Sequence, residues 1–520
     1  MERQSTEEKL NISAREMDPL EMMGLLVSHL RENNLDKPRS WTIKRSLMKG
    51  RGMFAIRDIR VGESIFTDVP LLMGPRCYSK CLPMCVVCYK NNCPLFPCDH
   101  DCGLPICSTE CENSMSHSQE CRTLREWMPT CGSTWSKDLL LAVVPIRGLA
   151  LSKEQRELLY AFECHSNLTH NHEIDLLKRS VNNLPSEEQM EFMRRICEVF
   201  NTNSFEVVIA RNEDCTTSLR GLYPLGALQN HCCVPNTRHH FDDQQRLHVS
   251  AALPIAAGEE LTMSYTDLLW DTSSRRQFLR VTKHFSCDCS RCCDPSEFGS
   301  QLGALLCAKD DCPGHLLPRN PLSLESPWIC DKCQISVNRR QIECIHSVLN
   351  TLVFDAMYKT PRKILKFIET ILSKLIPATN YIMLDAKYRI ISYFGRVPDL
   401  KWKGKIHIYS ICVCVIFSTL KKQNVICVIA DLTDKELRIK KMYCNDILST
   451  LDILDSGDSI KRGLVLYELY RTNLELSKRQ ISEEQTYPCI KDNEDNKCLL
   501  RQAMDILQND VGAASIRKSD

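Results

Sequence analysis

Cysteine is the residue type that most clearly offers chemistry in this chain, with 31 cysteines among 520 residues. Residues 1–9 are polar and charged, so the sequence predicts no signal peptide and a reducing compartment. In such a compartment, cysteines at ligand spacing indicate zinc sites rather than disulfides. The 66 basic residues nearly equal the 65 acidic ones, so electrostatic nucleic-acid binding is not expected as the main activity.

Four pairs of potential metal ligands lie close together in the first cysteine-rich block. The members of each pair are separated by two or three residues, so that one turn of the chain can direct both side chains at the same ion. Eight ligands can surround two tetrahedral zinc ions completely, which indicates structural sites. Cys81 and Cys93 fall outside this spacing and are expected to be non-ligands. The eight predicted ligands are Cys85, Cys88, Cys98, Cys102, Cys107, Cys111, His117 and Cys121.

A second cysteine-rich region covers residues 287–333 and contains two further groups. The first is a triplet with ligand spacing that must borrow a fourth ligand from elsewhere. Its members are Cys287, Cys289 and Cys292. The second group predicts a zinc ribbon, and buried or free thiols are the alternative. Its members are Cys307, Cys312, Cys330 and Cys333.

Two short motifs lie between the cysteine-rich regions. Residues 230–236 read Asn-His-Cys-Cys-Val-Pro-Asn and can place polar side chains on a polar ligand. Residues 258–265 read Gly-Glu-Glu-Leu-Thr-Met-Ser-Tyr and end an apolar strand on Tyr265. A core tyrosine that closes a strand is the alternative to a functional Tyr265.

The elements that must position these residues can be read from hydrophobic spacing. Residues 20–30 form an amphipathic stretch with helical spacing, and residues 41–73 alternate like strands between turn glycines. Apolar residues recur at helical spacing over 135–200, and strand and turn character returns over 205–266. Beyond residue 340 long amphipathic helices are expected, and paired helices like those of tetratricopeptide repeats would fit.

Residues 404–430 break the helical pattern of this last region with a β-branched, apolar run. The run is too short to span a membrane, which takes about 20 apolar residues. We interpret it as an insertion, such as a translated intron, and a comparison of transcript with gene would test this.

The order of the motifs gives the chain a family resemblance. Residues 230–236, 258–265 and 287–292 resemble the C-terminal half of a SET domain with its post-SET zinc site. Together with the eight-ligand block they resemble the SMYD family, in which a MYND zinc finger splits the SET domain, and within it the arthropod SmydA branch. The resemblance covers about residue 41 to 520, apart from the interpreted insertion. It implies an α+β fold with a SET-type β structure, an inserted MYND finger and helical insert, a post-SET zinc site and a C-terminal α-helical, TPR-like domain.

The resemblance also implies boundaries between the parts. They are an N-terminal extension (1–40), the N-terminal part of SET (41–80), the MYND finger (81–121), a helical insert (122–202), the SET core (203–268), a post-SET and zinc-ribbon-like segment (269–340) and the helical C-terminal domain (341–520). In the MYND finger, ligand pairs one and three would share one ion, and pairs two and four the other. Cys233 would complete the post-SET triplet, with Cys232 and Cys293 as competing candidates. Three zinc ions are therefore expected, and the ribbon would hold a fourth.

The activity implied by the resemblance is transfer of a methyl group from S-adenosylmethionine to a lysine of a histone or other protein. Tyr265 matches the family's catalytic tyrosine, which can orient the acceptor amine and shape a narrow apolar channel. The residues that match cofactor-contacting positions are Lys49, Gly50, Arg51, Gly52, Asn203, Asn230, His231 and Phe285. Pro235 and Asn236 complete the motif that begins at Asn230.

One position departs from the family pattern. Many active members carry a second tyrosine four residues before the post-SET triplet, where this chain has Lys283. A lysine here would bring a cation toward a sulfonium unless its side chain turns to solvent. The alternative function is therefore a catalytically weak or inactive scaffold for transcriptional regulation.

Several further expectations concern partners, location and the remaining histidines. The MYND finger is expected to bind proline-containing peptides, and neither direct nucleic-acid binding nor membrane insertion is expected. The expected location is cytoplasmic, nuclear or both. Five other histidines lack ligand partners at suitable spacing and are expected at the surface; they are His165, His170, His172, His239 and His240.

Overall fold

The computed structural model describes most of the chain. The described residues are 17–46, 50–76, 83–91, 93–165, 172–212, 215–357, 360–393, 428–484 and 490–507. Some of the residues with predictions made above lie outside the described residues, namely Lys49, Cys81, His170 and residues 404–427.

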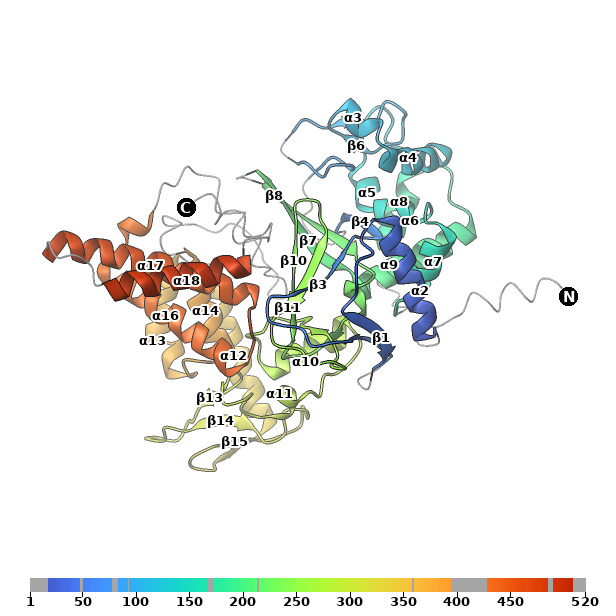
Figure 1. Ribbon diagram of the computed structural model, residues 1–520. Coiled ribbons are helices and arrows are strands. Elements are labelled where there is room, and N and C mark those ends of the chain that lie inside the picture. Colours follow the sequence, from blue (N-terminus) through green and yellow to red (C-terminus); the bar gives the residue numbers. More distant parts are fainter. Residues whose placement is uncertain are drawn as a thin grey trace.

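Three small antiparallel arrangements of strands form the centre of the molecule (Figure 1). A hairpin pairs β1 (Trp41–Arg45) with β2 (Arg51–Ala55). In the second sheet, β11 (Leu247–Ala251) lies between β10 (Thr237–Phe241) and β3 (Ser64–Asp68). In the third, β8 (Cys215–Leu222) lies between β4 (Leu72–Pro75) and β7 (Phe205–Asn212).

One short parallel pairing sets the register of the candidate site. Strand β9 (Asn230–His231) pairs with β12 (Thr262–Met263), so that Asn230 lies beside Thr262 and His231 beside Met263. Tyr265 follows this strand by two residues. The pairing therefore brings the polar motif and the strand-ending tyrosine to the same place.

Helices cover one side of these sheets and share their apolar core. The N-terminal helix begins after Asp18, whose side chain caps it; it buries Met22 and Leu26 and packs against β1. The prediction of a helix over 20–30 is confirmed. The helices on this side are α2 (Pro19–Glu32), α5 (Lys137–Leu141), α6 (Val143–Gly148), α7 (Lys153–Tyr160), α8 (His172–Ser180) and α9 (Glu187–Asn203).

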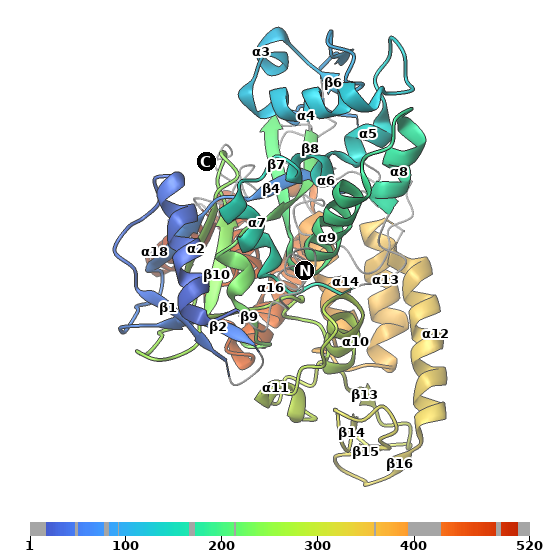
Figure 2. The ribbon, with the colours of Figure 1, turned by 90° about the vertical axis from the view of Figure 1, so that its right-hand side faces the viewer.

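The eight-ligand block forms a separate lobe at one end of the molecule, seen at the top of Figure 2. It contains little regular structure, as expected where coordination rather than a large core holds a short segment together. Its elements are β5 (Phe96–Pro97), β6 (Pro105–Ile106), α3 (Thr109–Glu112) and α4 (Met115–Trp127).

The second cysteine-rich region lies at the opposite end (Figure 2). Helix α10 (Thr272–Thr282) and the short α11 (Ser290–Cys293) precede a four-stranded antiparallel sheet. The strands of that sheet are β13 (Leu305–Leu306), β14 (His315–Pro318), β15 (Trp328–Cys330) and β16 (Ser336–Val337).

The C-terminal part is helical and has its own apolar core. Among its helices, α16 packs against α14 and α17, and α17 packs against α18. None of the helices in the described part of the chain is both long and apolar enough to cross a membrane. The helices are α12 (Arg339–Met357), α13 (Pro361–Thr370), α14 (Tyr381–Tyr393), α16 (Asp434–Ile453), α17 (Ile460–Glu484) and α18 (Ile490–Leu507); 3-10 turns lie at Gly226–Leu228, Leu372–Lys374 and Val428–Asp431.

Candidate functional site

A partly buried hydrogen-bond cluster joins the glycine turn after β1 to the polar motif of β9. The Asn230 side-chain amide donates to the Arg51 carbonyl at 3.0 Å and to Glu260 Oε1 at 2.7 Å. Glu260 also accepts from the Ser46 hydroxyl at 2.8 Å. A Cβ added at Gly52 would lie 2.1 Å from Glu260 Oε1, so any larger residue here would displace the Glu260 side chain from these hydrogen bonds. Glu260 is a positioning residue to which the sequence analysis gave no role, although it lies in the quoted 258–265 motif.

His231 has a defined hydrogen-bonding state. Its Nδ1 accepts from the Tyr265 backbone N–H at 3.0 Å, so the ring proton of the neutral imidazole belongs on Nε2. Nε2 lies 3.2 Å from the Cys233 sulfur and can donate to it. Burial lowers the pKa of His231 to about 4, which keeps the ring neutral. His231 therefore connects the tyrosine of the site to Cys233.

Tyr265 lies against aromatic neighbours with its hydroxyl fixed. The hydroxyl donates to the Gln229 carbonyl at 2.6 Å. The ring centroid is 5.3 Å from that of His231 and 6.5 Å, edge to face, from that of Phe285. Burial raises the pKa of Tyr265, so the phenol keeps its proton at neutral pH. It can orient a neighbouring group but is not set up to remove a proton from one.

Lys283 does not turn to solvent. Its Nζ lies 5.3 Å from the centroid of the Tyr265 ring and donates to the carbonyl of Thr202. Burial, together with the nearby charge of Arg220, lowers the pKa of Lys283 to about 8. Within the described residues, no carboxylate lies within ion-pairing distance of this amine. Lys283, which stands where many family members have a tyrosine, thus places an amine without a carboxylate partner among the described residues beside Tyr265.

Two other predicted cofactor-contacting residues differ in whether their side-chain N–H groups already donate hydrogen bonds within the protein. The Asn203 amide nitrogen donates to the carbonyls of Glu163 and Val199 at 2.7 and 2.8 Å, so it supports the fold. Arg51 donates through Nη2 to the Ala161 carbonyl. Its Nη1 is buried and has no partner within the described part of the chain. An unpaired buried guanidinium N–H is costly, and it marks a place where a ligand acceptor would fit.

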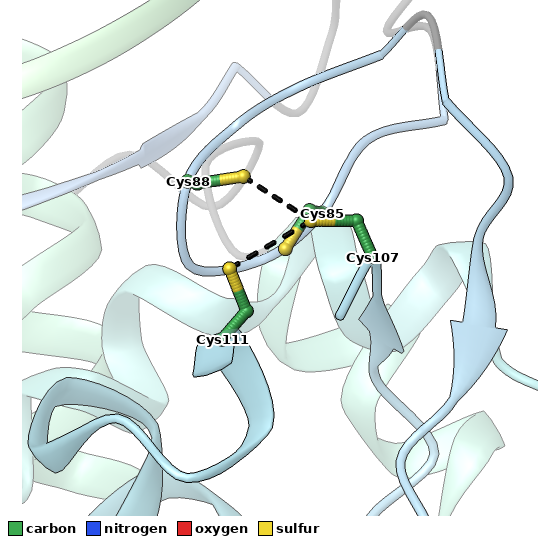
Figure 3. A group of neighbouring side chains, drawn as sticks. All are labelled: Cys85, Cys88, Cys107 and Cys111. Carbon is green, nitrogen blue, oxygen red and sulfur yellow. Dashed lines mark hydrogen bonds between the residues drawn. The ribbon is translucent and has the colours of Figure 1, made fainter. Parts of the chain in front are cut away.

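The predicted metal-ligand residues assemble into four sets in the described structure. In each set the ligand atoms all lie within 4.8 Å of one another, and the four sulfurs of the set in Figure 3 point toward a common centre. The grouping of pairs in the first block is the one that the family resemblance implied. Cys233, not Cys232 or Cys293, joins the triplet. The sets are Cys85–Cys88–Cys107–Cys111, Cys98–Cys102–His117–Cys121, Cys233–Cys287–Cys289–Cys292 and Cys307–Cys312–Cys330–Cys333.

The histidine of the first block is oriented by a chain of charged groups. His117 directs Nε2 toward the sulfurs of its set, and its Nδ1 lies 3.1 Å from Glu120. Arg147 of helix α6 pairs with the same carboxylate and donates to the Val86 carbonyl at 2.8 Å. A carboxylate behind a histidine fixes its tautomer and orientation for metal binding. Arg147 therefore ties the finger lobe to the helical insert.

Two buried arginines surround the set that contains Cys233. Arg275 donates to the Cys233 sulfur at 3.2 Å and lies 3.5 Å from the Cys292 sulfur. Arg291 donates to the Cys233 carbonyl at 3.1 Å. Glu297 pairs with both arginines, and all three side chains are buried. The net positive charge of these three side chains would compensate the negative charge of a buried cluster of thiolates.

The expectation that His239 and His240 lie at the surface is wrong. Both are half-buried on β10, where the His239 ring packs edge to face against Phe205 at 5.5 Å and the His240 ring stacks on His248 at 5.0 Å. Burial lowers the pKa of each to about 4. Their spacing gave no sign of this, because an edge-to-face partner such as Phe205 comes from a different strand.

Sequence comparison places the chain in a family. The SET domain model matches residues 50–266. SmydA-8 isoform A of Drosophila melanogaster is 34% identical over 385 residues, which cover 72% of this chain and 83% of that protein. The chain belongs to the SMYD family. Among other SMYD-type and SET-type relatives, the N-lysine methyltransferase SMYD2 of Gallus gallus is 24% identical over 69% of this chain and 79% of that protein. The histone-lysine N-methyltransferase ASHR1 of Arabidopsis thaliana is 28% identical over 58% of this chain and 66% of that protein.

Among solved structures, the similarity to this chain is weak. The SET domain of LSMT, bound to lysine and AdoHcy, aligns with 91% of this chain and 98% of that chain at 12% identity, with a TM-score of 0.25.

Proposed function

We propose that this SMYD-family chain is a protein-lysine N-methyltransferase that uses S-adenosylmethionine. The observation that carries the proposal is the convergence of Asn230, His231, Phe285 and Tyr265 beside the Gly52 turn. The named activities of the SMYD2 and ASHR1 relatives support it.

The residues beside Tyr265 fit a small charged, aromatic cofactor. The buried Nη1 of Arg51 offers a donor for an acidic group, and Phe285 offers a ring face near His231, with centroids 6.0 Å apart. Gly52 and the Asn230–Glu260 hydrogen bond hold two backbone segments close together, which creates a polar edge. These are the groups that would hold S-adenosylmethionine.

When bound, the cofactor would supply an electrophilic methyl group on a sulfonium. This chain's own part is positioning, since transfer to a neutral lysine amine is a direct displacement. Tyr265, held by Gln229 and flanked by Phe285, would align the incoming amine and exclude water from it. Neutral His231 would keep the Tyr265 backbone in place through its Nδ1.

The metal sets fit structural zinc. Each has four ligands of the thiolate or imidazole type, which is the closed, tetrahedral arrangement of structural sites. Around Cys233, the charge of Arg275 and Arg291 exceeds that of Glu297 by one, which favours ionised thiolates there. We therefore infer four zinc ions, all with scaffold roles.

The test is calorimetry with S-adenosylmethionine, followed by incubation with methyl-labelled cofactor and a cell protein extract. Binding and labelling of extract proteins are expected, with labelling reduced about 100-fold in Tyr265→Phe because the acceptor is misplaced. The exposed position in Lys153→Arg provides a matched control. Cofactor binding without labelling across many substrates would contradict the transferase.

A second candidate function is favoured by one observation, the inward-facing Lys283. In this case the chain is an inactive scaffold whose finger lobe recruits partners, including proline-containing peptides, in the cytoplasm or nucleus. Lys283→Tyr distinguishes the two functions. Activity that appears only in this variant supports the scaffold, while activity in the unaltered chain supports the enzyme.

A further inference from the structure

Lys283 is a partly buried amine for which the mechanism above has no use. It is the C-cap residue of α10, and its side chain reaches from there to the Thr202 carbonyl, one residue before Asn203. The same Nζ lies over the face of Tyr265. Three segments that converge on the proposed cofactor site therefore surround this one amine.

The surroundings of Lys283 do not stabilise a charge well. Within the part of the chain that the structure describes, the amine has one carbonyl acceptor and one aromatic face, and Arg220 on β8 adds repulsion instead of compensation. A buried ammonium normally requires a carboxylate, as Lys440 has in Glu468 at 2.7 Å. Lys283 is thus placed where an amine loses its proton more easily than an exposed lysine does, and a neutral amine is the nucleophile that methyl transfer needs.

We propose that Lys283 is a methylation site of this chain, with its Nζ in the place of the acceptor amine beside Tyr265. The proposal rests on the proposed function, because the methyl donor is S-adenosylmethionine at the site described above. In the step, the Nζ lone pair forms a bond to the methyl carbon. The carbon–sulfur bond breaks with its electron pair going to sulfur, which leaves S-adenosylhomocysteine. The nitrogen releases one proton to water.

Methylation would change the contacts of Lys283 in a defined way. A monomethylated amine keeps N–H groups for the Thr202 carbonyl, whereas a trimethylated one has none. The attraction to the Tyr265 face survives all degrees of methylation, since a quaternary ammonium also binds aromatic rings. Until it is displaced, the side chain also occupies the space that a substrate lysine would need.

The experiment uses the full-length chain, expressed so that it is unmethylated, and trideuteromethyl-labelled S-adenosylmethionine with no other protein. Peptide mass spectrometry should find the deuterated methyl group on Lys283. The fraction labelled per unit time should not depend on protein concentration, because the acceptor belongs to the same chain. Lys283→Arg should remove this label, Lys153→Arg should leave it, and Tyr265→Phe should slow it about 100-fold.

Calorimetry on the same preparation separates the two possible failures. If the cofactor binds but Lys283 stays unlabelled, whether or not other proteins are labelled, the inference is overturned while the cofactor site stands. If labelling of Lys283 rises with protein concentration, transfer occurs between chains and the inference is also overturned. If no cofactor binds to a chain with its metal and its circular dichroism intact, the proposed function itself fails.

Discussion

Two sets of four cysteines in this chain share ligand chemistry but differ in their surroundings. The set around Cys233 spans distant segments, since Cys233 and Cys292 are 59 residues apart, and three of its four members are buried. The set around Cys330 closes a local loop of 26 residues between Cys307 and Cys333, and three of its four members are half-exposed. Only the first set is contacted by buried arginines, as far as the described residues show.

The difference indicates that a zinc ion would have a different structural role in each set. At Cys233 a metal would join the strand that carries His231 to the segment that carries Phe285, so the site's geometry depends on it. At Cys330 a metal would hold a four-stranded sheet that also contacts the C-terminal helical part, as in the hydrogen bond from Leu306 N to the Leu375 carbonyl at 3.1 Å. Loss of the first ion should reach the candidate active site, and loss of the second should not.

The largest effect is expected from Cys233→Ser. It removes a buried ligand and leaves Arg275 facing an incomplete cluster, so the free energy of unfolding should fall by about 5 kcal/mol or more. Metal analysis should show one zinc ion fewer per chain, and calorimetry should show no S-adenosylmethionine binding. Cys232→Ser, at the neighbouring cysteine outside the set, should retain the full zinc content and the binding of S-adenosylmethionine. Equal effects of the two variants would remove the distinction between these cysteines.

The next effect concerns the charges around the first set. Glu297→Gln leaves Arg275 and Arg291 without their shared carboxylate, which should cost about 3 kcal/mol in chemical denaturation. Glu191→Gln breaks an exposed pair with Arg194 and should change little. If Glu297→Gln left the free energy of unfolding unchanged, the thiolates alone would be sufficient to compensate the charges of Arg275 and Arg291.

Cys312→Ser tests the second set and should have a smaller effect. The chain should lose one zinc ion and become sensitive to proteolysis between 307 and 333, while its melting temperature falls by only about 2–4 °C. Binding of S-adenosylmethionine should remain unchanged. A loss of binding in this variant would show that the two sets are coupled.

The smallest effect is a pH dependence at Lys283, near the first set. Its pKa is lowered to about 8 in the folded chain. Below that pH the folded chain therefore carries a charged amine in surroundings that disfavour the charge. Lys283→Met should therefore stabilise the chain at pH 7 by on the order of 1 kcal/mol. This gain should shrink as pH rises from about 8 toward the ordinary lysine value near 10.4, because the folded chain is then already neutral and the unfolded chain loses its proton as well. The measurement is a set of denaturation curves between pH 7 and 10, with Lys153→Met at an exposed position as the matched control.

Much of the metal chemistry could be predicted from the sequence, because ligand spacing along the chain reflects geometry around an ion. The triplet, by contrast, did not reveal its fourth ligand, and the resemblance supplied Cys233. The roles of Glu260, Arg275 and Glu297 could not be predicted, since each depends on contacts between segments far apart in the chain. The inward orientation of Lys283 was also open in the sequence, because a C-cap lysine can equally extend into solvent.

The Ser46–Glu260 hydrogen bond has a consequence for the order in which the protein is built. The two residues are 214 positions apart, and the β2 strand meets the same region through the Phe54–Glu260 bridge. At a synthesis rate of about 5–20 residues per second, the first hairpin waits roughly 10–40 s on the ribosome for its partner. During that time α2, which contacts β1 and has already been synthesised, can shield the apolar side chains of the hairpin. The N-terminal helix is therefore in place early enough to protect the nascent hairpin until Glu260 emerges.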